Sequence, residues 1–164
     1  MSALNLIKTL EMLLKTYEKL TTAAVQKTKI IKKGDLSALQ STITEEKLFL
    51  QALQKLESKL QNETKLFLKA DQSSDRNITL TECINAAADP EKQELSGIKS
   101  ALEEQISMLK QQNELNQQLI EQSLQFVNMS IDMLSPEIDS YNYDRPHQGH
   151  DIEETKRSIF DSKA

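Results

Sequence analysis

The residues whose types and spacing could support chemistry are few, and the clearest group lies near the C-terminus of the chain. His147 and His150 stand close to Asp144 and Asp151, and all four are residue types that bind metal ions. A metal site also needs a rigid scaffold and supporting hydrogen bonds around its ligands. The surrounding sequence has no periodicity that would supply them, so we predict no metal site and no cofactor.

Cys83 is the only cysteine of the chain. A single cysteine excludes an internal disulfide and suits a reducing compartment. Because no histidine lies near it in the sequence, we interpret Cys83 as a small buried hydrophobe and not as a nucleophile. The many Asp and Glu residues have the distribution of solvated helix faces, and no glycine-rich phosphate loop occurs. We therefore predict that the protein is not an enzyme.

The charge and hydropathy of the chain reduce the number of function classes that fit it. A formal net charge of −5 argues against nonspecific binding to nucleic acid or to an anionic membrane surface. No stretch approaches the roughly 20 apolar residues of a membrane span. Polar residues at Asn5, Lys8 and Glu11 interrupt any signal-peptide core. We expect a cytoplasmic protein.

Long helices must position whatever side chains the protein uses, because three glycines and three prolines leave few breakers. A first helix is predicted over residues 3–33. Gly34 then allows a left-handed stop, and Asp35 can cap a second helix over about residues 36–69. Such a tight turn makes the two helices antiparallel. The apolar residues of the first helix recur every three or four positions, at Leu6, Leu10, Leu13, Tyr17, Leu20, Ala24 and Ile31.

The second half of the chain predicts a short helix and then a long one. Thr79 and Glu82 have the spacing of a capping box, which predicts a short helix over residues 80–87. Asp89 and Pro90 then form a helix start, and no strong breaker follows until Ser135-Pro136, which ends the helix after Leu134. Asn113 falls in the apolar stripe of this long helix, where it sets register or reflects partial exposure.

These elements predict an all-α fold. We expect an elongated antiparallel helical hairpin with a short helix and a long third helix, arranged as a coiled-coil-like three-helix bundle. Residues 1–135 would form this helical domain. Residues 136–164 have no periodicity and would form a mobile C-terminal tail, which either has no role or is a docking segment that orders on binding.

The end of the long helix is the most informative part of the sequence, because residues 119–134 are apolar on two opposite sides at 100° per residue. One stripe would pack this helix against the hairpin, and the other would face a partner protein. Burial of both sides inside a three-helix bundle, or a homodimer, would also cover the second stripe. The packing stripe consists of Ile120, Leu124, Val127, Ile131 and Leu134, and the partner-binding stripe of Leu119, Phe126, Met129 and Met133.

Several segments, in their order along the chain, resemble FlgN-type flagellar export chaperones. The Gly34-Asp35 break and the helix through Leu56-Glu57 resemble the first hairpin of that family, and Leu80-Thr81-Glu82-Cys83-Ile84 resembles its short helix. The strongest local resemblance combines Asn116, Leu119, Ile120, Ser123, Leu124, Phe126 and Val127 with Met133-Leu134, and the tail segments Tyr143-Asp144 and Arg157-Ser158-Ile159-Phe160-Asp161 resemble family endings.

The resemblance implies a cytosolic chaperone for hook–filament junction proteins of the FlgK and FlgL type. It would cover their amphipathic terminal helices before secretion and deliver them to the membrane export gate. In the tail, Tyr141, Tyr143, Ile159 and Phe160 would contact the gate or the cargo. Two other readings stay open at this point: a structural coiled-coil scaffold, and a regulatory adaptor that sequesters another protein through the same helical surface.

Overall fold

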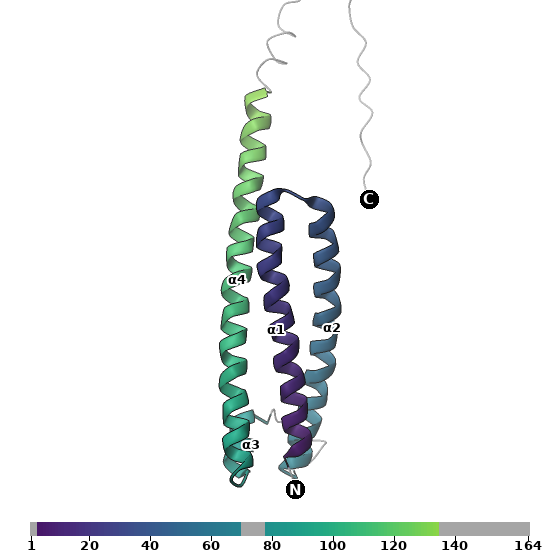
Figure 1. Ribbon diagram of the computed structural model, residues 1–164, viewed down its shortest axis with the longest axis vertical. Helices are drawn as coiled ribbons and strands as arrows, with labels where there is room; N and C mark the ends of the chain where they lie inside the picture. The colour runs from purple at the N-terminus through teal and green to yellow at the C-terminus, as the bar shows by residue number, and fades with distance from the viewer. Residues whose placement is uncertain (1–2, 70–77, 135–164) are drawn as a thin grey trace, which may run out of the picture. The chain divides into compact units, whose positions relative to one another are not determined.

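The computed structural model describes residues 3–69 and 78–134 of the chain. These residues contain four α-helices and no strand (Figure 1). The chain divides into two units, Met1–Leu124 and Gln125–Ala164, and the described part of the second unit is the C-terminal end of the last helix. The all-α fold class is therefore confirmed. The helices are α1 (Leu4–Lys33), α2 (Leu36–Phe67), α3 (Leu80–Ala86) and α4 (Glu91–Leu134).

The turn between α1 and α2 has the geometry that the sequence predicts. Gly34 adopts a left-handed conformation with φ of 70°, and its N–H donates to the carbonyl of Ile31 at 3.1 Å. Asp35 then caps α2, because its side chain accepts a hydrogen bond from the N–H of Ala38 at 3.0 Å. Glycine pays no steric penalty for a positive φ, so the chain reverses here without strain. Figure 1 shows α1 and α2 side by side below this turn.

Local signals also set the boundaries of α3 and α4. The N–H of Thr79 donates to the carboxylate of Glu82 at 2.8 Å, and the N–H of Glu82 donates to the Thr79 hydroxyl at 3.3 Å. This is the capping box that the spacing predicts. The Asp89-Pro90 peptide bond is cis, and the N–H of Glu94 donates to the carbonyl of Pro90 at 3.2 Å in the first turn of α4.

The apolar core of the first unit lies where the start of α1 meets α3 and the start of α4. Leu6, Leu10, Cys83 and Leu95 are the largest apolar side chains that are fully shielded from solvent there. Further buried members of the same cluster are Ile7, Leu13, Leu20, Leu53, Ile84, Ala87 and Leu102. Burial of these side chains supplies the main stabilisation of the fold.

Hydrogen bonds fix how α4 runs along α1. The N–H of Ala3 donates to Glu91 at 3.0 Å, and the hydroxyl of Thr21 lies 3.3 Å from the Gln105 side-chain oxygen. The residue number increases in the same direction along both helices, from Ala3 to Thr21 and from Glu91 to Gln105, so α1 and α4 run parallel. Within the first unit, α1 lies between α2 and α4 (Figure 1). The antiparallel hairpin and a long helix beside it agree with the predicted architecture.

Candidate functional site

The predicted partner-binding stripe lies on an exposed part of α4. Phe126, Met129 and Met133 expose 71%, 64% and 78% of their surface. Leu119, the fourth member, is half-buried. Methionine and phenylalanine with this much exposure are unusual on a helix that has no partner, and methionine adapts its shape to different ligands. This part of α4 therefore has the chemistry of a binding surface.

The predicted packing stripe is exposed as well. Its five members expose between 38% of their surface at Ile120 and 71% at Leu134. Leu124 is exposed because α1 ends at Lys33, soon after Thr28, the last α1 residue bonded to α4. Burial thus does not distinguish the two stripes, and the separate roles assigned to them stay predictions. The other exposed members are Val127 and Ile131.

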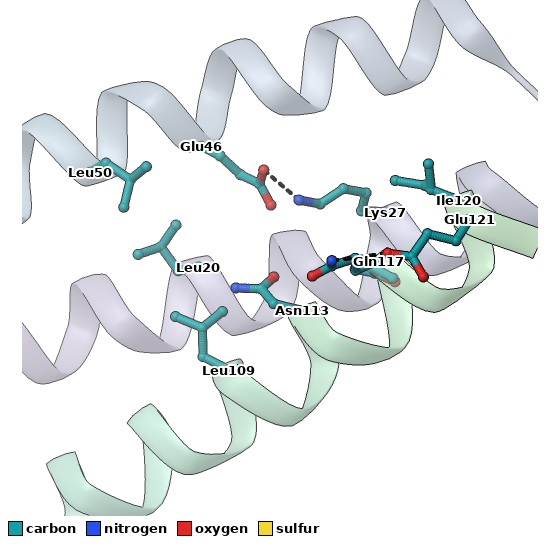
Figure 2. Close-up of a pocket in the computed structure, with 10 residues that line it drawn as sticks. Leu20, Lys27, Glu46, Leu50, Leu109, Asn113, Gln117, Ile120 and Glu121 are labelled. Carbon is teal, nitrogen blue, oxygen red and sulfur yellow. Dashed lines mark hydrogen bonds and ion pairs between the residues drawn. The ribbon is translucent and has the colours of Figure 1, made fainter. Parts of the chain in front are cut away.

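A groove in the first unit is a second candidate site, and Figure 2 shows its lining. Its volume is about 450 Å³. We call it the α1 groove, because α1 forms its floor between the walls made by α2 and α4. The lining residues are Leu20 and Lys27 of α1, Glu46 and Leu50 of α2, and Leu109, Asn113, Asn116, Gln117, Ile120 and Glu121 of α4.

Charged and amide side chains occupy the middle of the α1 groove. Lys27 forms an ion pair with Glu46 across α1 and α2, with 2.7 Å between the ammonium nitrogen and the carboxylate oxygen. Both side chains are largely shielded from solvent, which limits screening of the pair. On the opposite wall, the amide of Gln117 donates to the Glu121 carboxylate at 3.0 Å. Both interactions are drawn in Figure 2.

A buried hydrogen-bond cluster holds α4 to α1 beside this groove. The Asn116 amide donates to the backbone carbonyl of Ala24 at 2.8 Å, and its oxygen accepts a hydrogen bond from the Thr28 hydroxyl. The Thr28 hydroxyl in turn accepts one from Gln112. Of the two alternatives predicted for Asn113, register setting and partial exposure, the structure shows exposure, because Asn113 lines the groove and Asn116 makes the buried contact. One sequence signal for this contact was missed. Thr21 and Thr28 of α1 are seven residues apart, as are their hydrogen-bond partners Gln105 and Gln112 of α4.

In the described ranges, neither Cys83 nor the acidic side chains are arranged for catalysis or metal binding. Cys83 is fully buried, and burial, followed by the neighbouring Glu82 carboxylate, raises the pKa of its thiol. Among residues 3–69 and 78–134, no group of three His, Cys, Asp or Glu side chains could hold a metal ion. His147 and His150 lie outside the described residues, as do Asp144 and Asp151.

The predicted tail contacts also lie outside the described residues: Tyr141, Tyr143, Ile159 and Phe160. The predicted boundary between residues 1–135 and 136–164 stays a prediction. Within the described part of the chain, no helix has the length and apolar character needed to cross a membrane.

Comparison with known proteins places this helical architecture in a family. The model of the FlgN protein family matches residues 1–149. The chain is also 33% identical over 164 residues, the full length of both sequences, to the uncharacterized protein YvyG of Bacillus subtilis (strain 168). No solved structure matches it. With most of the chain matched by the family model, and with the hairpin, short helix and long helix in place, this protein belongs to the FlgN family of flagellar chaperones.

Proposed function

We propose that this protein is a cytoplasmic flagellar export chaperone that binds hook–filament junction proteins of the FlgK and FlgL type. It would bind their amphipathic terminal helices, prevent premature assembly or aggregation, and deliver them to the export gate of the flagellar type III secretion system. The observation that carries the proposal is the exposed apolar end of α4, where Phe126, Met129 and Met133 are mostly open to solvent.

The physical problem that such a cargo poses matches this surface. An amphipathic terminal helix that is buried only in the assembled flagellum exposes its apolar stripe beforehand. A chaperone covers that stripe with an apolar stripe of its own, in the helix-in-groove mode of recognition. Burial of about 600 Å² of apolar surface at ~25 cal/mol/Å² contributes about 15 kcal/mol before the costs of association. After those costs, micromolar to nanomolar affinity is expected.

In this proposal Leu119, Phe126, Met129 and Met133 contact the cargo helix. Methionine side chains allow the same helix to accept both FlgK-type and FlgL-type cargoes, because they repack at low energetic cost.

Co-expression with the hook–filament junction proteins tests the proposal directly. The chaperone is tagged and used to capture full-length cargo and, in parallel, cargo that lacks its terminal helices. Capture that requires the terminal helices supports the proposal. Equal capture of both forms, or no capture of either by the folded chaperone, contradicts it.

Delivery to the gate is a separate step with its own test. In the proposal, Tyr141 and Tyr143 contact the export gate, and Ile159 and Phe160 contact the gate or the cargo. Replacement of both tyrosines by alanine should weaken gate binding while cargo binding persists. Unchanged gate binding in this double variant would exclude the role assigned to the two tyrosines.

A further inference from the structure

The α1 groove is long enough along α4 for a short helix to lie in it. Along α4, its lining runs from Leu109 to Ile120, and the lining residues between these two apolar side chains are the polar Asn113, Asn116 and Gln117. At 1.5 Å per residue this is a distance of about 16 Å, or three helical turns. The walls are the two helices α2 and α4, and α1 lies between them as the floor (Figure 2). A further helix laid over α1 would therefore contact three helices at once, as helices do in a four-helix bundle.

The apolar side chains of the groove lie at positions that helix packing normally covers. Leu20 is buried at the floor, whereas Leu50 on one wall and Ile120 on the other are 51% and 38% exposed. Leu20 belongs to the same three-and-four spacing as the buried Leu6, Leu10 and Leu13. The core pattern thus reaches the floor of the groove at the covered Leu20, and the open apolar surface is that of Leu50 and Ile120 on the two walls.

The charges of the groove indicate what a ligand helix carries. Lys27 and Glu46 neutralise each other in their ion pair. Glu121 is held by Gln117, and no cationic side chain of the described residues forms an ion pair with it. The groove therefore has an excess of one negative charge, which a Lys or Arg of the ligand would complement.

We propose that the α1 groove binds one amphipathic helix of an export substrate, with the substrate's apolar stripe on Leu50 and Ile120 and a basic residue beside Glu121. This inference rests on the proposed function and adds a second contact surface to the exposed end of α4. The substrate helix completes the packing that α1, α2 and α4 leave open.

A matched pair of leucine variants tests the apolar contact. Leu50 lies in the groove, whereas Leu48 is exposed on another side of α2. Calorimetric titration of the full chain with a purified hook–filament junction protein should show a Kd raised about tenfold or more by Leu50→Glu, because a charge enters an apolar contact. Leu48→Glu should leave the Kd within about twofold. Equal effects of the two variants would overturn the inference.

A charge reversal tests the predicted basic residue. Glu121→Lys should raise the Kd about fivefold, and the effect should shrink at high salt. The same change at Glu104, exposed on α4 outside the groove, serves as the control. A substrate in which the matching Lys or Arg is changed to Glu should bind the Glu121→Lys chaperone more tightly than it binds the wild-type chaperone. No such restoration at any basic position of the terminal helix would overturn the predicted charge contact.

The outcomes separate this inference from the proposed function. If the substrate fails to bind the wild-type chain, the proposed function fails and the inference with it. If it binds and Leu50→Glu has no effect, only the groove inference fails. Should Leu50→Glu lose helicity by circular dichroism, Ile120→Glu in the opposite wall replaces it. Light scattering of the chain alone completes the test, because a dimer that Leu50→Glu dissociates would make the groove a contact between two copies and overturn the inference.

Discussion

The side-chain amide of Asn116 in α4 donates a hydrogen bond to the backbone carbonyl of Ala24 in α1, with 2.8 Å between nitrogen and oxygen. Thr28 donates to the oxygen of the same amide, so Asn116 uses both of its polar ends across the α1–α4 contact. A polar side chain that is satisfied only at one relative position of two helices fixes their register. This relationship sets which residues of α4 reach the α1 groove.

Loss of the Asn116 amide should therefore destabilise the fold. Asn116→Ala leaves buried polar groups of Ala24 and Thr28 with fewer partners, and we expect a loss of about 1–3 kcal/mol in the free energy of unfolding. Asn113→Ala is the matched control, since Asn113 is exposed on the same helix and gains the same helix propensity. Urea unfolding followed by circular dichroism measures both. Equal stability of the two variants would exclude a register role for Asn116.

The sequence was sufficient for elements whose cause is local. Gly34 with Asp35, and Thr79 with Glu82, each act through hydrogen bonds within a few residues, so their spacing predicted the hairpin turn and the start of α3. The same holds for the long run of α4, which contains no proline and only one glycine, Gly97, between Pro90 and Ser135.

Contacts between helices were less predictable. Periodicity shows which residues share a face, but not what lies opposite that face, and so it left open whether Asn113 sets register or is exposed and did not identify Asn116 as the polar residue of the contact. For the same reason it identified two apolar stripes on residues 119–134 but not their common exposure. The α1 groove combines residues of three helices and has no signature in any one of them.

The exposed end of α4 should be dispensable for folding and essential for binding cargo. We expect Phe126→Asp with Met133→Asp to abolish capture of hook–filament junction proteins, because two charges would enter the apolar contact. Since both side chains are mostly exposed, helicity and the urea midpoint should stay unchanged. Gln125→Asp with Asn128→Asp, two exposed polar positions of the same helix, adds two negative charges as a control. Unfolding of the Phe126 and Met133 variant would instead identify these residues as core.

The two described glycines should respond to alanine with opposite signs. Gly34 has a positive φ, so Gly34→Ala should cost about 1–2 kcal/mol of stability through backbone strain alone. Gly97 is an exposed helical residue, and an added Cβ would meet no atom within 4 Å beyond its chain neighbours and the helix backbone, so Gly97→Ala should stabilise the protein by about 0.5–1 kcal/mol. Thermal unfolding of both variants gives the comparison. A destabilising Gly97→Ala would show that α4 needs flexibility at this position.

Stability should fall in alkaline solution because of Cys83 and Tyr17. Burial raises the pKa of the Cys83 thiol, with a smaller effect from Glu82, and burial followed by the Glu57 carboxylate raises the pKa of the Tyr17 phenol. Each folded group holds its proton at a pH where the unfolded chain has released it. The folded state then binds more protons, and the free energy of unfolding decreases as pH rises.

The two groups act in different pH windows. The Cys83 contribution is complete below the unfolded thiol pKa of about 8.5 and is lost as pH rises through the folded value, whereas that of Tyr17 is lost only above about 10. Urea titrations between about pH 8.5 and 10 give the free energy of unfolding as a function of pH. In this range its decrease with pH should be smaller for Cys83→Ala than for the wild type, and Tyr17→Phe should behave as the wild type. Above pH 10, Tyr17→Phe should in turn reduce the slope. An identical slope for the wild type and Cys83→Ala below pH 10 would mean that the thiol reaches solvent before the protein unfolds.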